Sequence, residues 1–569
     1  MSGKEIGGDT VGEVQTGDTV GEKIAGTGFE PVLDITQDQI EADLNVTEND
    51  LINARDHAKD FTLEETRQIM TKVLGVHLKD PNFPVVIVDK IKAFLGNEDI
   101  FEHPENYTDL IFEMKAEAAL ITGNSPYAEV RAVVDNTDDM TMPCSTIRVW
   151  VIGLLFVVAL AFINQLFSIR QPQIVVTANV VQLLCFPVAK AAEAILPDWG
   201  FTLFGTRHSL NPGKFSPKEH MLITIMASVG WDYPYTDDII WSQYLPQYFN
   251  QSYAGHFGYQ ILVALSTNLI GYGIAGVCRR FLVYPAYCVW PASLVTIALN
   301  GAFHTDKNIA VPGPFKKIFT ISRLRFFLYA FIAMFVYFWF PNYIFQALSI
   351  FNWMTWIAPN NVNLGIWYAN SYYTGYLPIN SNRVFDHFGE LYNISHAINE
   401  KGLFDGPKYE AYSPAYLSSG YATVYLFFFA IYAAVISYTY LYHRHEIAMG
   451  FRNLFNSFRK KEDRNNDHDY TDVHNRLMAK YPEVPEWWYL LALCFAVCLG
   501  CAGIAGWQTY TTVGVVFYGI LLCLIFVVPV GIIKAITGIE ITLNVLAEFI
   551  GGSWAGGNAL DMNYFKAFG

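Results

Sequence analysis

Residues 147–168 read IRVWVIGLLFVVALAFINQLFS, and stretches of this kind decide the fold of the chain. A helix needs about 20 predominantly apolar residues to cross the roughly 30 Å hydrocarbon core of a bilayer, and this stretch is long enough. The further stretches of the same character are 173–195, 258–278, 283–303, 323–345, 415–441, 487–508 and 511–536, with weaker or broken candidates at 219–245 and 346–365 and a Gly-rich, re-entrant candidate at 541–569. The chain is therefore predicted to be an all-α, polytopic transmembrane helical bundle with about ten spans and with broken or re-entrant helices.

The composition favours a membrane protein over a set of soluble domains. The chain is 52% hydrophobic and 16% charged, whereas soluble domains carry roughly 25% charged residues. The net charge of −15 comes from residues 1–140, which hold 29 acidic and 11 basic side chains, while the remaining 429 residues hold 23 and 26. An N-terminal region of this sign is not expected to bind nucleic acid or anionic lipid.

The polar N-terminal region divides into two predicted parts. Residues 1–55 are rich in Gly, Thr, Asp and Glu, and with so few apolar residues they are predicted to be a disordered acidic tail. Residues 56–140 are predicted to form an amphipathic helical cytosolic region, because Thr62 and Glu65 form a capping-box pattern before an apolar stripe. The membrane domain then covers residues 141–569. No signal peptide precedes the tail, so the N-terminus is expected in the cytosol.

Two sequons predict which loops lie outside the cell. With a cytosolic N-terminus and both weaker candidates counted as spans, the loops 246–257 and 366–412 are outside. These loops contain the sequons that begin at Asn250 and Asn393. Glycosylation of either asparagine requires that side of the membrane.

The basic residues give a second prediction of orientation. The cytosolic loop 443–485 holds eight Lys/Arg, as the positive-inside bias expects. One loop disagrees, because residues 304–322 fall outside in this scheme. That loop contains Lys307, Lys316 and Lys317.

Three of the eight cysteines fall on one face of a predicted helix. Cys494, Cys498 and Cys501 are spaced i, i+4, i+7. They are consistent with a soft-metal site or with small residues at a helix–helix interface, and the second interpretation is favoured. No metal site and no cofactor are predicted.

Broken helices indicate where a solute binds, because irregular backbone at membrane depth is tolerated where it is buried in protein or lines a cavity. In residues 220–247 the apolar run stops at GWDYPYTDD (230–238), and residues 341–364 are interrupted by prolines and asparagines. Aromatic walls with a few amides suit a peptide, although an interfacial aromatic belt is an equal alternative. The candidate substrate-binding residues are Trp231, Tyr233, Tyr235, Trp241, Trp353, Trp356, Asn361 and Asn544.

Ionisable residues inside apolar segments are costly, so each is a candidate for function. Glu548 has no evident local partner, and a carboxylate in an apolar setting has a raised pKa and can exchange a proton near neutral pH. The candidates for proton coupling are, in order, Glu548, Glu540, Asp232 and Glu193. For each one alone, a satisfied or interfacial acid is the plainer interpretation, and Glu193 can pair with Lys190 three residues earlier.

Enzyme and pump motifs are absent from the sequence. It contains no phosphate-binding glycine loop, no HExxH and no nucleophile elbow. An enzyme and a nucleotide-driven pump are therefore disfavoured, which leaves secondary transport.

Several motifs in one order resemble those of the oligopeptide transporter (OPT) family. They are SPYAEVRAVV (125–134), Asn164-Gln165, Asn211-Pro-Gly213 with Lys218-Glu-His220, Asp472-Val-His474, VPEWWY (484–489) and Leu543-Asn544-Val545 with Glu548. The Asn-Pro-Gly motif is similar to that of the peptide-transporting branch and argues against the metal-chelate branch.

The resemblance implies proton-coupled import of short peptides through the plasma membrane by alternating access, with glutathione as one candidate substrate. The implied partners are peptide, protons and the lipid bilayer, and the acidic tail suits a fungal member. Members of the family continue with further spans beyond the point matching Gly569, so the chain is expected to be truncated. The alternatives are an importer of metal or siderophore chelates and a non-transporting remnant.

Overall fold

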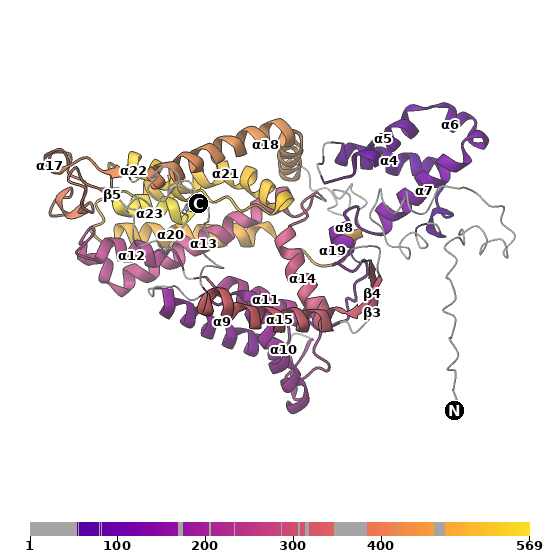
Figure 1. Cartoon of the computed structure of the whole chain (residues 1–569), viewed down its shortest axis with the longest axis horizontal. Helices are drawn as coiled ribbons and strands as arrows, with labels where there is room; N and C mark the ends of the chain where they lie inside the picture. Colours follow the sequence, from indigo (N-terminus) through magenta and orange to yellow (C-terminus); the bar gives the residue numbers. More distant parts are fainter. Residues whose placement is uncertain are drawn as a thin grey trace, which may run out of the picture. The chain divides into compact units, whose positions relative to one another are not determined.

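The chain forms two compact units in the computed structural model, which Figure 1 shows as a ribbon. The N-terminal unit extends to Arg131 and includes residues 470–476, and the membrane unit comprises residues 132–469 and 477–569. The structure describes residues 54, 56–78, 80, 82–168, 175–203, 206–232, 234–285, 287–304, 308–312, 318–345, 384–417, 419–459 and 473–568. The predicted disordered tail, apart from Ala54, and the candidate span 346–365 lie outside these residues.

The N-terminal unit is helical. Its elements are α4 (Leu63–His77), α5 (Val85–Gly96), α6 (Asp99–Glu102), α7 (Thr108–Gly123) and α8 (Ala128–Arg131). The predicted capping box begins α4, since Thr62 Oγ1 accepts from the Glu65 N–H at 3.2 Å and Glu65 Oε2 accepts from the Thr62 N–H at 2.9 Å. The apolar faces of α4, α5 and α7 meet in a core that includes Met70, Ile87, Ile91 and Met114, all at most 1% exposed.

A buried polar network joins α4 to the SPYAEVR motif. His77 Nδ1 lies 2.9 Å from Asp80 Oδ2, and the Tyr127 hydroxyl donates to the same carboxylate oxygen. Burial raises the pKa of Asp80, but hydrogen bonds from His77, Tyr127 and the Asn82 N–H outweigh it, so the pKa lies below its ordinary value. Tyr127 of the motif is therefore an anchor of the N-terminal unit.

Asp80→Asn is expected to destabilise the N-terminal unit by about 1–3 kcal/mol at neutral pH, because a buried charged acceptor is lost. Since folding lowers the pKa of Asp80 from 3.8, its contribution is present above that pH and is lost as the pH falls through the lowered value. Hydrogen exchange of α4 and α7 in the full chain should be faster in the variant at neutral pH and equal once Asp80 is protonated. Equal exchange at neutral pH would contradict the expectation.

The membrane unit confirms the all-α, polytopic prediction. In the part of the chain that the structure describes, five helices are long and apolar enough to cross a membrane: α9 (Ile147–Ser168), α10 (Ala178–Ile195), Tyr421–Arg444 within α18 (Ser419–Arg459), α20 (Glu486–Ala505) and α21 (Gly514–Thr537). The other elements of at least seven residues are α11 (Pro217–Gly230), α12 (Thr236–Tyr244), α13 (Phe257–Leu282), α14 (Pro291–His304), α15 (Arg323–Trp339), α17 (Gly406–Tyr412), α22 (Asn544–Trp554) and α23 (Ala559–Phe568).

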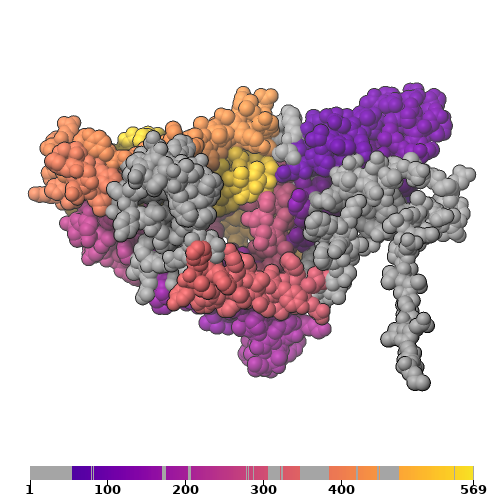
Figure 2. All heavy atoms as spheres, in the orientation of Figure 1, coloured from indigo at the N-terminus to yellow at the C-terminus, as the bar shows by residue number. Residues whose placement is uncertain are grey.

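Short antiparallel strand pairs connect some of these helices. They are β1 (Gly200–Leu203) with β2 (Thr206–Ser209), β3 (Asn308–Pro312) with β4 (Ile318–Ser322), and β5 (Val384–Phe385) with β6 (Tyr416–Leu417). Figure 2 shows α15 in red on the surface that faces the viewer. Phe331, Phe335 and Trp339 of this helix are exposed. Exposed aromatic side chains along a whole helix are typical of a surface that faces lipid.

The membrane unit has two hydrophobic cores. In the described residues, one lies among α9, α10 and α11, and the other among α12, α13, α18 and the helices α20 to α23 (Figure 1). The chain crosses from the first group of helices to the second at residues 231–235, where α11 ends and α12 begins. The predicted break in 219–245 is confirmed, and Pro234 within it removes a backbone donor that a continuous helix would need.

One end of the membrane unit, here called the Lys218 end, collects contacts between segments that are distant in the sequence. Lys218 Nζ lies 2.7 Å from Asp138 Oδ1 and donates to the Tyr481 hydroxyl at 2.8 Å. At the same end, Arg279 near the end of α13 pairs through Nη2 with Oε1 of Glu486, the first residue of α20, at 2.8 Å.

The helix α14 also lies at the Lys218 end, so the predicted span 283–303 is wrong. The Trp290 N–H just before it donates to Ala535 O at 2.8 Å, near the end of α21. Asn300 Nδ2 near its other end donates to Pro217 O at 3.0 Å, at the start of α11. A helix of 14 residues rises only about 21 Å, so α14 bridges the two groups of helices instead of crossing. The chain therefore leaves α14 from the Lys218 end, and the three lysines of the following loop, Lys307, Lys316 and Lys317, lie outside the described residues.

The packing of α13 against α20 corrects the interpretation of the cysteines. The buried small residues of α20 are Ala496, Gly500 and Gly503, whereas Cys494 and Cys498 are exposed. Small residues do form the interface between α13 and α20, as expected for membrane helices. These residues are Ala496, Gly500 and Gly503, and the cysteines lie on the neighbouring face of α20.

Gly276→Ala is expected to lower the stability of the membrane unit by about 1–3 kcal/mol through overpacking. A Cβ at Gly276 would lie 2.2 Å from Tyr489 Cγ, whereas a Cβ at Gly271 on the same helix would meet nothing within 4 Å. Gly271→Ala is therefore the matched control, because both changes share the same gain in helix propensity. Thermal unfolding of the detergent-solubilised protein compares them, and equal midpoints would contradict close packing at Gly276.

Candidate functional site

The candidate site lies at the break between α11 and α12. On the α11 side of this break, Asn164 of α9 holds the backbone in place. The Asn164 carboxamide donates to Trp231 O and to Val176 O and accepts from the Val176 N–H, the last two at 2.8 Å. Asn164 is only 3% exposed. Because one buried side chain satisfies three backbone groups, the end of α11 is fixed to α9 and to the start of α10.

The second side of the break is held by α23. The Tyr235 hydroxyl donates to Asn563 Oδ1 at 3.4 Å, and Asn563 Nδ2 donates to Ser242 Oγ at 3.0 Å. Lys566, one turn further along α23, places its ammonium 4.8 Å from the centroid of the Tyr235 ring. Tyr235 therefore contacts both a carboxamide and a cation.

Glu548 joins this group from α22. Its Oε2 lies 3.4 Å from Lys566 Nζ, with the two side chains 30% and 24% exposed. The sequence indicated no partner for Glu548, and the structure corrects this, because the α22–α23 hairpin brings Lys566 back onto it. The site therefore contains an ammonium, a carboxylate, a phenol and a carboxamide, all near a break in a helix.

The other candidate residues for proton coupling lie apart from this group. Glu193 pairs with Lys190 at 3.0 Å and accepts from the Phe215 N–H at 2.8 Å. Glu540 pairs with Lys534 at 2.9 Å, and Asp232 is exposed in the break.

The remaining substrate-binding candidates are only partly placed. Trp241 is exposed on α12, and Asn544 begins α22. Four further candidates lie outside the described residues: Tyr233, Trp353, Trp356 and Asn361.

The Asn-Pro-Gly motif forms a buried polar junction at the Lys218 end. Arg148 Nη2 pairs with Glu219 Oε2 at 2.7 Å, and both side chains are 0% exposed. Arg148 Nη1 donates at 3.1 Å to Asn211 Oδ1 and at 3.1 Å to Gly213 O. Glu219 also accepts from Thr146 Oγ1 at 2.6 Å. The motif therefore holds α9 to α11 and lies away from the candidate site.

Two histidines connect α11 to α14 beside this junction. His220 Nδ1 lies 3.0 Å from His304 Nε2, and His220 Nε2 donates to Gln182 O at 2.8 Å. His220 is fully buried. The two histidines therefore hold α14 against α11. Within the described residues, no three His, Cys, Asp or Glu side chains are grouped so that they could hold a metal ion.

Both sequons lie at the opposite end of the membrane unit, here called the sequon end. Asn250 and Asn393 are exposed. The residue after Asn250, Gln251, donates through Nε2 to Gly402 O at 3.3 Å, which brings the turn at 249–251 against the segment 384–417. The described parts of the two predicted outer loops are therefore neighbours in space.

The polar residues of α23 were not among the site residues predicted from the sequence. Asp561, Asn563 and Lys566 occur within ten residues of an otherwise apolar segment, and that pattern was the available signal. Asp561 is 2% exposed, and its Oδ2 accepts from Thr511 Oγ1 at 2.7 Å, while no group among the described residues donates to its Oδ1.

Comparison with known proteins gives one family. The family model described as OPT oligopeptide transporter protein matches residues 144–366 and 362–569. The chain is 37% identical over 500 residues to the sexual differentiation process protein isp4 of Schizosaccharomyces pombe, covering 78% of this chain and 61% of that protein. It is 30% identical over 580 residues to oligopeptide transporter 2 of Saccharomyces cerevisiae, covering 90% and 64%.

A third relative is glutathione transporter 1 of Schizosaccharomyces pombe, which is 31% identical over 504 residues, covering 78% of this chain and 57% of that protein. The chain thus spans about three-fifths of the length of these curated relatives. No solved structure matches it.

Proposed function

The chain belongs to the OPT oligopeptide transporter family, and from this premise we propose that it imports short peptides across the plasma membrane by alternating access, coupled to protons. Oligopeptides and glutathione are named as the cargo of two of its relatives. Peptides of a few residues, glutathione included, are the proposed substrate class.

The ion pair between Lys566 and Glu548 supports this proposal most directly. A short peptide is a zwitterion, so its carboxylate and its ammonium can replace the two partners of a pair that is already 24% and 30% exposed. Tyr235 and Asn563 beside the pair supply hydrogen-bonding groups for backbone amides. With Glu548 protonated, the Lys566–Glu548 pair is exchanged for a pair between Lys566 and the peptide carboxylate, which limits the cost of removing charges from water.

The two groups of helices suit alternating access, in which one group moves against the other around a central site. Residues 231–235 and α14 connect them, and the candidate site contains the first of these connections. With both connections acting as hinges, the central site would open to the sequon end to receive a peptide and then to the Lys218 end to release it.

Glu548 is the proposed site of proton coupling, because protonation would remove the charge that holds Lys566. The proton would enter with the peptide, and Lys566 would then be free to bind the peptide carboxylate. Each unit of pH difference supplies about 1.4 kcal/mol per proton, enough for roughly tenfold accumulation.

The orientation has the sequon end outside and the Lys218 end, with the N-terminus, in the cytosol. Support comes from the contact between the two sequon-bearing segments and from the cluster of Lys218, Arg279 and their partners at the other end. Positive residues favour the cytosolic side of a membrane. Asn250 and Asn393 are then the proposed glycosylation sites.

Uptake of a labelled tetrapeptide by cells that display the chain at their surface tests the proposal. Uptake should be faster at about pH 5.5 than at about pH 7.5, and a proton uncoupler should abolish it, because the proton gradient is the driving force. Uptake that is indifferent to the uncoupler would exclude proton coupling, and no uptake of any short peptide would exclude peptide import by this chain.

A further inference from the structure

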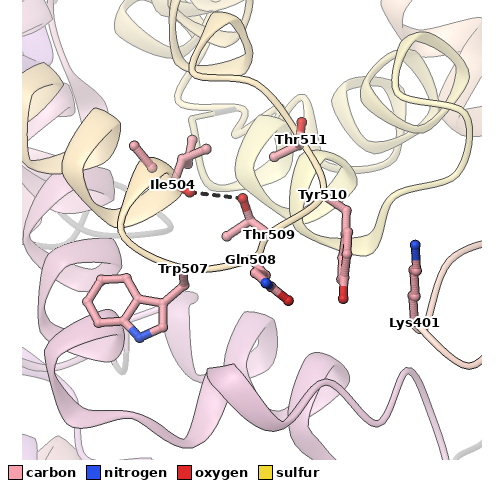
Figure 3. Close-up of a pocket in the computed structure, with 8 residues that line it drawn as sticks. Lys401, Ile504, Trp507, Gln508, Thr509, Tyr510 and Thr511 are labelled. Atoms are coloured by element: carbon pink, nitrogen blue, oxygen red, sulfur yellow. Dashed lines mark hydrogen bonds between the residues drawn. The ribbon is translucent and has the colours of Figure 1, made fainter.

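An open surface pocket of about 480 Å³, here called the cavity, lies at the sequon end of the membrane unit. It is lined by the turn between α20 and α21 and by Lys401 from the segment 384–417. Figure 3 shows the side chains of Lys401 and Tyr510 at one side, Trp507 at the other and Gln508 between them. The cavity is separate from the group around Tyr235.

The turn that carries Lys401 is held in place by backbone contacts. Asn399 Oδ1 accepts from the N–H groups of Lys401 at 2.9 Å and Leu403 at 3.0 Å. Gly402 has φ +70, a conformation that glycine adopts without strain. A Cβ there would lie 2.2 Å from Phe249 O, so the turn is packed closely against its neighbour.

The turn between α20 and α21 that lines the cavity is held as firmly. Thr509 Oγ1 donates to Ile504 O at 3.0 Å, and Asn558 Nδ2 donates to Thr509 O at 3.1 Å. Tyr510 has φ +58, which is uncommon for a residue with a bulky side chain. Such a backbone persists when its surroundings enforce it, and it is frequent at sites that bind ligands.

The ammonium of Lys401 is available to an anion. It lies 5.5 Å from the centroid of the Tyr510 ring, and no carboxylate in the described part of the chain pairs with it. A cation on a rigid turn, next to an aromatic ring and a carboxamide, is a pre-organised partner for a carboxylate.

We infer that this cavity captures the C-terminal carboxylate of a peptide, with Lys401 as the cationic partner and Tyr510 and Trp507 as apolar walls for the last side chain. The inference rests on the proposed function and adds an outer binding site to it. Peptides with a free carboxylate are then preferred over peptides with an amidated C-terminus.

The cavity is joined to the candidate site through α23. Thr511 of its wall donates to Asp561 at 2.7 Å, and Lys566 lies on the same helix as Asp561. A peptide bound beside Thr511 would therefore lie next to α23, the helix that carries Lys566 of the Lys566–Glu548 pair.

Calorimetric titration of the purified full-length chain with tetra-alanine and with tetra-alanine amide tests the inference. The wild-type protein should bind the free acid about tenfold more tightly than the amide, as a charge-assisted contact provides. Lys566 of the candidate site is also proposed to bind a peptide carboxylate, so Lys401→Gln is compared with its parent in a Lys566→Met background. There Lys401→Gln should weaken binding of the acid about tenfold and leave binding of the amide unchanged. Lys408→Gln is the matched control, because Lys408 lies in the same segment but donates to Ile398 O at 3.1 Å.

Peptide uptake by the same proteins separates this inference from the proposed function. Loss of the acid preference with Lys401→Gln in the Lys566→Met background supports the cavity even if the chain transports nothing. An unchanged acid preference there overturns the assignment of the cavity even if uptake is robust, and so does equal binding of acid and amide by the wild type.

Discussion

Arg148→Met is expected to destabilise the membrane unit by about 3–5 kcal/mol, because it leaves the Glu219 carboxylate buried without its cation. Arg148 and Glu219 are both 0% exposed and 2.7 Å apart. Removal of the guanidinium also leaves the carbonyl of Gly213 without its donor. The thermal midpoint of the detergent-solubilised protein and its amount at the cell surface should both fall.

A double-mutant cycle identifies the charge as the cause. Glu219→Gln keeps a polar side chain that can cap the start of α11, where the Ser216 N–H donates to Glu219 at 2.9 Å. Arg148→Met combined with Glu219→Gln should therefore be more stable than Arg148→Met alone, since no charge remains unpaired. An additive double variant would show that packing, and not the ion pair, accounts for the loss.

An exposed pair serves as the control for this cycle. Lys59 and Asp56 lie 3.2 Å apart with side chains 59% and 70% exposed. Lys59→Met should change stability by less than about 1 kcal/mol, because water screens such pairs. A loss as large as that of Arg148→Met would mean that burial does not set the effect.

Lys566→Met is expected to reduce peptide uptake about 30- to 100-fold, because the bound peptide would exclude water from the pair between Lys566 and its carboxylate, and truncation of one partner of such a pair has an effect of this size. Lys566 contacts both Glu548 and the ring of Tyr235, so its loss removes the cation proposed to receive the peptide carboxylate. Initial uptake rates, normalised to the protein at the cell surface, measure the effect.

Two further variants show whether Lys566 acts on the peptide or only on Glu548. Lys566→Met and its combination with Glu548→Gln are compared by binding of tetra-alanine to the solubilised protein, because Glu548→Gln by itself would stop proton-driven uptake. The combination should bind as weakly as Lys566→Met if Lys566 binds the peptide carboxylate, and should recover binding if the role of Lys566 is to neutralise Glu548. Lys534→Met breaks the comparable pair with Glu540, at 2.9 Å, outside the candidate site. It should leave uptake unchanged, and an equal loss there would remove the special role of Lys566.

The sequence by itself determined the positions of several helices that are long and apolar enough to cross a membrane, and where one helix breaks. Hydropathy is a local property, so α9, α20 and α21 could be read directly from runs of apolar residues. The break at 231–235 was equally local, because a proline among polar and aromatic residues interrupts an apolar run. The capping box of Thr62 and Glu65 involves residues three apart, and it formed as predicted.

The tertiary structure decided which charges meet. Arg148 and Glu219 are 71 residues apart, and Glu548 meets Lys566 only because α22 and α23 fold into a hairpin. The apolar stretch 283–303 had the composition of a span, yet its contacts with Ala535 and Pro217 make α14 a bridge. A hydrophobic run indicates that a segment is shielded from water. Whether it contacts lipid or another helix depends on packing partners that are distant in the sequence.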